Sequence, residues 1–281
     1  MRLVHPQHPE YPVGLHDLED PPAIWVAGTL RESPGVSVVG TRRCTRYGVG
    51  LSEAFGAAIA AAGWTVVSGL ARGIDAAAHR GCLDAHGHAV AVLGSGVDVC
   101  YPAENRPLFD RILSTDGAIV SEYPPGTPPD RWRFPARNRI IAAMSAAVVV
   151  VEANETGGAL ITARIGAEIG RPVFVVPGDV DRPASAGCNR LIKDGAHPVL
   201  GSTDLIAELE LVLGPAPARP VQSFAAVPDG GVDIEDLAEL WGVSIAEALG
   251  RVGRMELAGE VRRRGTWIHP ASRGEPGDPG T

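Results

Sequence analysis

Arginines and aromatic rings gather in two short segments of this sequence. Residues 40–48 read GTRRCTRYG, with three arginines and a tyrosine, and residues 131–139 read RWRFPARNR, with four arginines and two aromatic rings. Guanidinium groups form paired hydrogen bonds with phosphate oxygens, and ring faces stack on unpaired bases. The composition therefore predicts contact with a single-stranded nucleic acid. Two other interpretations are an ion pair between Arg42 and Glu152, and a solvated helix start at 131–139, which leaves its two rings unexplained.

Glycines stand at three further positions where contact with an anion is expected. Gly69 lies in SGLARGID (68–75), and Gly157 and Gly158 lie in ETGGALITA (155–163). Glycine at the start of a helix lets backbone N–H groups approach an anion closely. These segments therefore predict backbone contacts to phosphate beside the arginine-rich segments.

The sequence motifs favour neither an enzyme nor a cofactor-binding protein. The GxGxxG pattern of dinucleotide-binding folds is absent, which disfavours NAD and FAD, and Ser68 does not lie in the G-x-S-x-G motif of hydrolases. Asp75 and His79 are four residues apart and share a helix face. Without a third group, structural hydrogen bonds are favoured over a catalytic or metal-binding pair. We expect no cofactor, no metal and no enzymatic activity.

The elements that must position these residues alternate along the chain. Short runs rich in valine and isoleucine predict strands that are buried on both faces, and the segments between them have helical character. The predicted strands are VSVVG (36–40), WTVVSG (64–69), AVAVLG (89–94), AIVSE (118–122), AAVVVVEA (146–153), RPVFVVPG (171–178) and HPVL (197–200). Strand followed by helix, repeated, indicates an α/β fold with a doubly wound parallel sheet, whose ligand site lies at the carboxyl ends of the strands.

The remainder of the chain divides into four further parts. Residues 1–35 form an N-terminal extension, whose run AIWVAGTL could add an edge strand to the core domain at 36–213. A linker rich in proline, alanine and glycine is predicted at 214–231, a winged-helix domain at 232–270 from its helix, helix, hairpin pattern, and a flexible tail at 271–281.

Length, charge and cysteine content narrow the class of protein. The chain has 281 residues, enough for about two domains, and a formal net charge of −8. This charge excludes a protein that coats nucleic acid or an anionic membrane, but it permits binding in a local pocket. The four cysteines show no spacing of a zinc site or disulfide framework. No signal sequence or long apolar run is present, so we expect a cytoplasmic protein without a membrane partner.

Eight sequence blocks together resemble the DprA/Smf family of DNA-processing proteins. In order, they are GTRRCTRYG, SGLARGIDAAAH, AVLGSGVDVCYPAENRPL, SEYPPGTPP, FPARNRIIAAMS, VVVEANETGGALITA, VPGD and GCNRLIKDGA. The resemblance implies an extended Rossmann-like core and a small C-terminal winged-helix domain. It also implies a homodimer that binds and protects single-stranded DNA and loads the RecA recombinase during natural transformation. The family is not known as an enzyme.

The resemblance also implies which residues of this sequence form the DNA-binding site. It implies a pocket with Arg42, Arg137 and Arg139 as DNA contacts, shaped by Phe134 together with Gly40, Gly69, Gly157 and Gly158; Arg43, Arg72 and Asn138 lie in the same blocks. Arg72 stands where a small or neutral residue is expected. About 35 residues precede the core, so we expect the extra N-terminal helical domain of many members to be absent. Replacing Arg42 or Arg137 by alanine should weaken DNA binding without unfolding the protein.

Two other functions compete with this hypothesis. The first is a nucleotide-binding or phosphoribohydrolase enzyme of the LOG type, which carries PGGxGTxxE at the same strand end. Here Leu160, Ile161 and Arg164 replace the third glycine, the threonine and the glutamate of that motif, so the catalytic carboxylate is missing. The second is a regulator of duplex DNA that acts through its winged helix and uses the adjacent arginines at 262–264.

Overall fold

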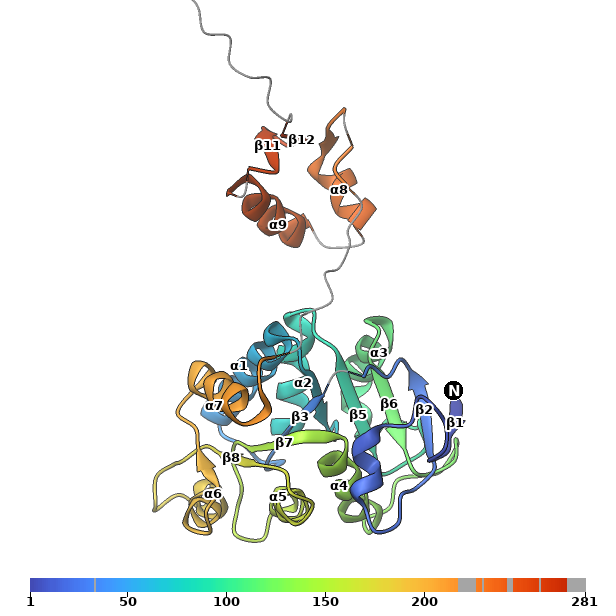
Figure 1. Ribbon diagram of the computed structural model, residues 1–281, viewed down its shortest axis with the longest axis vertical. Helices are drawn as coiled ribbons and strands as arrows, with labels where there is room; N and C mark the ends of the chain where they lie inside the picture. The colour runs from blue at the N-terminus through green and yellow to red at the C-terminus, as the bar shows by residue number, and fades with distance from the viewer. Residues whose placement is uncertain (33, 217–225, 229, 242–244, 258, 272–281) are drawn as a thin grey trace, which may run out of the picture. The chain divides into compact units, whose positions relative to one another are not determined.

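The computed structural model covers residues 1–281 and describes all of them except 33, 217–225, 229, 242–244, 258 and 272–281 (Figure 1). The chain forms two compact units, Met1–Arg219 and Pro220–Thr281. Each unit is described by itself below. The predicted tail therefore lies almost wholly outside the described residues, as does most of the central part of the predicted linker.

A nine-stranded sheet forms the centre of the first unit, with the order β1-β2-β6-β5-β4-β3-β7-β8-β9. The strands are β1 (Arg2–Val4), β2 (Ile24–Gly28), β3 (Gly35–Val39), β4 (Thr65–Ser68), β5 (Ala89–Leu93), β6 (Ala118–Ser121), β7 (Ser145–Val150), β8 (Val173–Val175) and β9 (His197–Pro198). Strands β3 to β9 pair in parallel, whereas β1 and β2 are antiparallel at one edge. The predicted N-terminal extension thus contributes β1 and β2 to the sheet of this unit.

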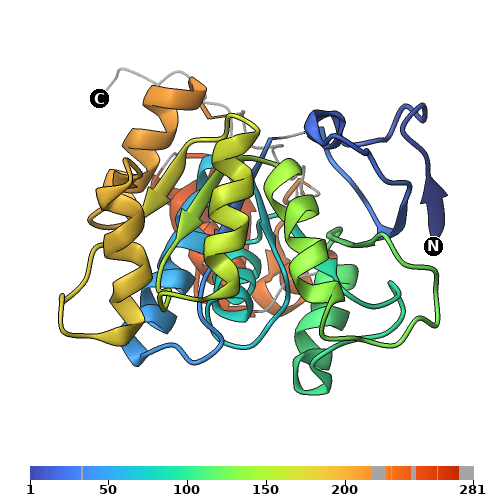
Figure 2. The same cartoon turned by 90° about the horizontal axis from the view of Figure 1, so that it is seen from below.

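Helices cover both faces of the sheet and create two hydrophobic cores (Figures 1 and 2). The first face carries α1 (Arg46–Ala62), α2 (Ile74–Asp84), α3 (Arg106–Ser114) and α7 (Ser202–Leu213), and the second carries α4 (Arg133–Ala143), α5 (Gly158–Glu168) and α6 (Pro183–Lys193). Two short 3-10 helices, η1 (Val13–Asp17) and η2 (Ala103–Asn105), lie in the connections. The first unit is therefore a three-layer α/β/α fold.

Alternate side chains of the central strands enter opposite cores, which explains the continuous apolar runs. On β7, Val149 packs in the core beneath α1 and α2, while Val148 and Val150 pack in the core beneath α4 and α5, and all three are fully buried. Strands of this kind need apolar residues at every position. The predicted mostly parallel doubly wound sheet is confirmed.

The second unit has a separate core. Its elements are β10 (Val232–Asp233), α8 (Ile234–Trp241), α9 (Ile245–Leu257), β11 (Val261–Arg264) and β12 (Trp267–Pro270), with the sheet order β10-β12-β11. Leu237, Ala248, Val252 and Ile268 are fully buried in this core. Two helices followed by a hairpin is the order that a winged helix requires, and the winged-helix assignment remains a prediction.

The cysteines lie in or near the packed interior of the first unit. Cys82 and Cys188 are fully buried, and Cys44 and Cys100 are partly buried. Among the described residues, no group of three or more His, Cys, Asp or Glu side chains has the arrangement of a metal site. Of the helices in that part of the chain, none combines the length and apolar character that crossing a membrane requires.

Candidate nucleic-acid interface

The direction of chain winding reverses between β3 and β7. From β3 the chain continues to β4, β5 and β6 on one side, whereas β7 is followed by β8 and β9 on the other. Ligands of doubly wound folds bind at such a reversal, outside the carboxyl ends of the strands. Here the reversal places the loop after β3, which holds Arg42 and Arg43, beside the loop that follows β7.

The two loops are held tightly together at Gly40. A Cβ atom on Gly40 would lie 2.4 Å from Ile74 Cγ1 and 2.8 Å from the Glu152 carbonyl oxygen, so no larger residue fits without a backbone shift. The Thr41 N–H donates to the same carbonyl oxygen at 2.7 Å. Gly40 therefore fixes the start of the arginine loop against β7.

Glu152 is engaged with the start of α1. Its carboxylate accepts hydrogen bonds from the Thr45 backbone N–H at 2.9 Å and from the Thr45 hydroxyl at 2.5 Å. The Thr45 hydroxyl in turn accepts from the N–H of Gly48 and caps the helix. The alternative in which Glu152 pairs with Arg42 is therefore not the arrangement in this structure.

Arg42 instead lies over an aromatic ring. Its guanidinium carbon is 4.9 Å from the centroid of the Phe134 ring, a cation–π contact that orients the charge without neutralising it. The Tyr101 ring lies 5.3 Å from Phe134 and is 41% exposed. Arg42 and the neighbouring Arg43 are themselves exposed. A guanidinium and two rings from three separate segments thus meet at the carboxyl edge of the sheet.

A second aromatic cluster lies at the N-terminus of α4. Trp132 is 59% exposed, meets Tyr123 edge to face at 6.0 Å between centroids, and donates its indole N–H to Asp130 at 2.8 Å. The Arg133 guanidinium lies 4.9 Å from the Tyr123 ring and 5.2 Å from the Trp132 ring. These contacts hold the exposed indole in one orientation.

Tyr101 and Tyr123 are candidate site residues that were not predicted from the sequence. Both follow a strand of the parallel sheet, β5 and β6 respectively, so their position at the carboxyl edge was available from the pattern. The signal was the tyrosine next to proline in YPAENRPL and in SEYPPGTPP.

Arg137 is buried, whereas Arg42 is exposed. The Arg137 side chain is almost fully buried, at 4% exposure, and its guanidinium donates to the carbonyl oxygens of Gly69, at 2.8 Å, and Val92. Burial lowers the pKa of Arg137 to about 10, and the carboxylate of Asp75 acts in the opposite direction. A Cβ on Gly69 would lie 2.1 Å from the guanidinium, so Gly69 makes room for Arg137. The structure therefore places both residues in the packing behind the surface.

Arg72 and Arg139 both face carboxylates. Arg72 forms two hydrogen bonds with Glu104, at 2.6 and 2.7 Å, and both side chains are exposed. Arg139 pairs with Glu122 and is about one quarter exposed. Surface pairs of this kind are worth little to stability. They reduce the positive charge that either arginine offers to a phosphate, so Arg42 and Arg43 are the more available cations of the predicted set.

The paired glycines lie at the start of α5. The buried Asn138 side chain donates from Nδ2 to the Gly158 carbonyl oxygen at 3.1 Å and so connects α4 to α5. Gly157 is the N-terminal cap of α5. Neither glycine has a positive φ. The structure therefore gives Asn138 and Gly158 a role in joining two helices near the interface.

Asp75 and His79 both lie in the interior on α2. The Asp75 carboxylate accepts from the Gly69 N–H at 3.1 Å, and His79 Nε2 is 3.2 Å from the Val90 carbonyl oxygen. Burial raises the pKa of Asp75 and lowers that of His79 to about 4. Each group bonds to the backbone of a neighbouring segment, which is the structural role that their spacing favoured.

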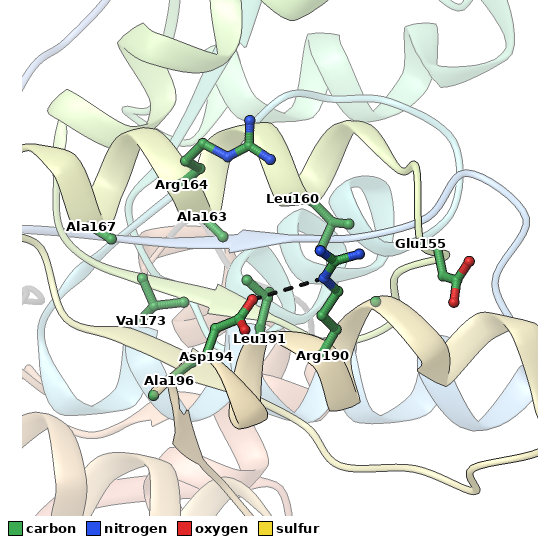
Figure 3. Close-up of a pocket in the computed structure, with 12 residues that line it drawn as sticks. Glu155, Leu160, Ala163, Arg164, Ala167, Val173, Arg190, Leu191, Asp194 and Ala196 are labelled. Carbon is green, nitrogen blue, oxygen red and sulfur yellow. Dashed lines mark ion pairs between the residues drawn. The ribbon is translucent and has the colours of Figure 1, made fainter.

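A pocket of about 420 Å³ lies between α5 and α6 (Figure 3). Apolar side chains, including Leu160 and Leu191, line it together with the charged Glu155, Arg164 and Arg190. Arg190 is 3.9 Å from Asp194, which also lines the pocket. None of the predicted DNA contacts lines this pocket, so it is separate from the arginine and aromatic surface.

The chain is similar to known proteins over most of its length. The family model for DNA recombination-mediator protein A matches residues 2–210. The Smf protein of Synechocystis is 46% identical over 215 residues, covering 74% of this chain and 54% of the relative, so this chain spans about half that relative's length. The DprA protein of Streptococcus pneumoniae is 41% identical over 211 residues, 71% of each chain.

Solved structures show the same likeness. The crystal structure of DprA from Streptococcus pneumoniae has a TM-score of 0.69 at 39% identity, covering 74% of each chain. A structure of Helicobacter pylori DprA, which is described as showing a unique single-stranded DNA binding mode, has a TM-score of 0.68 at 27% identity and covers 75% of this chain and 96% of that one. The resemblance found in the sequence is confirmed: this chain belongs to the DNA recombination-mediator protein A family, which includes the DprA and Smf proteins.

Proposed function

We propose that this protein binds single-stranded DNA at the carboxyl edge of its sheet. The observation that carries the proposal is Arg42, exposed and held over Phe134 where the chain winding reverses. An oriented guanidinium binds a phosphate, while the neighbouring rings offer faces to unpaired bases. The Helicobacter pylori relative, a DprA protein of the same fold, binds single-stranded DNA, which supports the same ligand class here.

The strand would follow a line of two aromatic clusters. Phe134 and Tyr101 form the first, beside Arg42, and Trp132 with Tyr123 forms the second, beside Arg133. Stacking of bases on aromatic rings is tolerant of sequence because every base has a π face. We therefore expect binding with little preference for sequence and a strong preference for unpaired DNA. Arg72 and Arg139 are secondary contacts in this proposal, because each must share its charge with a carboxylate.

Fluorescence anisotropy tests the ligand class. Oligo-dT, a matched duplex and a nucleoside monophosphate are titrated at several salt concentrations. Single-strand binding predicts that dT binds tightest and that log affinity falls with log salt by about 0.7 for each neutralised phosphate. A preference for the duplex would contradict the proposal. Hydrolysis of the monophosphate to the free base and ribose 5-phosphate would support the LOG-type alternative instead.

The LOG-type alternative is disfavoured by the position of Arg164. This residue replaces the glutamate that the LOG motif places at that position, and it lies on α5 at the wall of the separate pocket (Figure 3). Hydrolysis at the sugar needs a negative charge to stabilise the developing positive one. An arginine there would oppose the reaction. We therefore propose a binding protein in place of an enzyme.

The wider function follows from the family. We propose that the protein acts in the cytoplasm as a homodimer, protects incoming single strands and loads the RecA recombinase onto them during natural transformation. Membership of the DNA recombination-mediator family supports a role in recombination. Sedimentation velocity tests the dimer, and DNA-stimulated ATP hydrolysis by RecA tests loading. A monomer, or RecA activity that does not change when the protein is added, would contradict these two parts.

A further inference from the structure

The hairpin of the second unit presents one face with two arginines and two aromatic rings. In the register of β11 and β12, Arg264 is directly opposite Trp267, and Arg262 is directly opposite His269. Directly opposite residues, and residues two apart on a strand, share a face. Arg262, Arg264, Trp267 and His269 therefore lie together on what we call the hairpin face.

The opposite face of the hairpin is the one that packs in the core. Val261 and Ile268 are buried there at 3% and 0% exposure. Arg263 is directly opposite Ile268, so its side chain leaves the strand on that inner side, although it remains exposed. The alternation explains why three adjacent arginines do not act as one patch. Only the first and third belong to the hairpin face.

The hairpin face is open and positively charged. Arg262 and Arg264 are exposed, and neither forms a salt bridge within the described part of the chain. Trp267 is 49% exposed, and its ring is stacked with His269 at 6.3 Å between centroids and 23° between planes. An exposed, oriented indole beside two free guanidiniums is a combination that hydrophobic burial does not explain.

The carboxylate of Asp233 borders the hairpin face. Asp233 on β10 is directly opposite Trp267 on the side away from β11. Its side chain accepts a hydrogen bond from the Glu235 backbone N–H at 3.0 Å, and a hydrogen bond from the Thr266 side chain lowers its pKa. Asp233 is therefore occupied with the start of α8, and the two arginines set the charge of the face.

We infer that the hairpin face is a second binding site for single-stranded DNA. Phosphates of the strand pair with Arg262 and Arg264, which are about 6.8 Å apart along β11 at the usual rise of a strand. A base stacks on Trp267. A duplex keeps its base faces stacked inside the helix, so it leaves the exposed ring without a partner. This site belongs to the second unit and does not depend on the proposed site around Arg42.

The three adjacent arginines provide a matched test in the full-length protein. Arg262→Ala, Arg263→Ala and Arg264→Ala each remove one positive charge from the same strand. We expect the first and third each to lower the slope of log affinity for a long oligo-dT against log salt by about 0.7, and Arg263→Ala to leave it unchanged. Equal effects of all three variants would overturn the proposal, because they would reflect net charge alone.

The ring provides an independent readout. Trp267→Ala should weaken oligo-dT binding by about fivefold or more, with an unchanged thermal unfolding midpoint. Oligonucleotides that contain 5-iododeoxyuridine should form a photochemical cross-link at Trp267, mapped by mass spectrometry. Unchanged affinity together with no cross-link at residue 267 would overturn the proposal. So would a loss of duplex binding with single-strand binding intact.

The variant Arg42→Ala separates this inference from the proposed function of the first unit. Distant, independent sites have additive effects, so the hairpin variants should show the same fold-change in the Arg42→Ala background. A hairpin effect without an Arg42 effect would contradict the site on the first unit and leave the hairpin site standing. An Arg42 effect without a hairpin effect would overturn only the hairpin site.

Discussion

Arg42 and Arg137 lie near the same edge of the sheet, but their surroundings give them different roles. Arg42 is exposed and lies over the ring face of Phe134, and its guanidinium forms no hydrogen bond or ion pair with any other described residue, so its donors remain available to a ligand. Arg137 is buried, and its Nη1 group donates to the carbonyl oxygens of Gly69 and Val92. Removing the first should therefore affect binding, whereas removing the second should affect folding.

We predict that Arg137→Ala destabilises the protein by about 3 kcal/mol or more. The substitution leaves two buried carbonyl oxygens without their donor and leaves the buried Asp75 without a compensating charge. This differs from the sequence-based expectation that the variant would keep its fold. Urea denaturation measures the change. A stable Arg137→Ala protein that has lost DNA binding would restore the interpretation of Arg137 as a direct contact.

A second residue-scale prediction concerns His79 and acid stability. The unfolded chain takes up a proton on this histidine below its ordinary pKa of 6.5, but the folded protein does so only below about 4. The lowered pKa of His79 therefore contributes to the free energy of unfolding above pH 6.5. This contribution, up to about 3 kcal/mol, is lost as the pH falls towards 4.

The variant His79→Gln isolates this effect. The raised pKa of Asp75 acts in the opposite direction, because it favours the folded state as the pH falls, and it is present in both proteins. Urea denaturation at pH 7, 5.5 and 4.5 should show a flatter loss of stability in His79→Gln than in the native sequence. If the free energy of unfolding changed with pH in the same way in both proteins, the pKa of His79 would not be lowered by burial.

The sequence alone predicted that arginines and aromatic rings gather at one site. It did not predict which of them remain exposed and available to bind DNA. Arg137 and Arg139 are two residues apart, and spacing within a helix does not reveal the buried carbonyl oxygens near one or the Glu122 carboxylate near the other. Tyr101 reaches Phe134 from a different segment, after β5. These contacts depend on the three-dimensional arrangement of loops, which no local pattern encodes.

At the scale of elements, glycines decide how closely α1 and α2 pack. A Cβ on Gly56 of α1 would lie 2.1 Å from the Ala78 carbonyl oxygen, and one on Gly81 of α2 would lie 1.9 Å from the Glu53 carbonyl oxygen. The two helices thus contact each other through their backbones. This packing supports the start of α1, where Thr45 and the arginine loop lie.

We predict opposite effects for two glycine substitutions on the same helix. Gly56→Ala must push α1 away from α2 and should destabilise the protein by about 1 to 3 kcal/mol. Gly50→Ala, also on α1, meets nothing within 4 Å and should stabilise by about 0.5 to 1 kcal/mol, because alanine favours the helix. Chemical denaturation distinguishes them. Similar changes in both variants would mean that the backbones are not in contact.

The positions of the strands were largely predictable from the sequence, but the pairing of each strand with its neighbours in the sheet was less so. The valine-rich runs located β3 to β8 because strands buried on both faces leave a continuous apolar signal. The run AIWVAGTL indicated an edge strand. In the structure β2 (Ile24–Gly28) lies inside the edge strand β1 and pairs antiparallel with β6. An apolar run does not specify its partner, so this pairing was beyond the sequence.

At the scale of the whole molecule, the chain consists of two units with separate cores. Val227, Leu237 and Ile268 belong to a cluster that contains only residues of the second unit. Each unit therefore has the internal packing that independent folding requires. The net charge of −8 is spread over both units, and local arginine clusters determine where an anionic strand can bind.

We predict that the chain truncated after Arg219 keeps the thermal unfolding midpoint of the first unit. Its two cores are complete without the second unit, so no apolar surface within them is newly exposed. Differential scanning calorimetry of the full chain and of the truncated chain makes the comparison. A large drop in the midpoint would show that the first unit depends on the second.

The central claim is that Arg42 is a direct phosphate contact, and the salt dependence of oligo-dT binding tests it most directly. The matched control is Arg111→Ala, which removes an arginine from the last turn of α3, where it pairs with Asp84. We predict that Arg42→Ala weakens binding and lowers the salt slope by about 0.7, while Arg111→Ala changes neither. Identical affinities and slopes for the two variants would contradict the account.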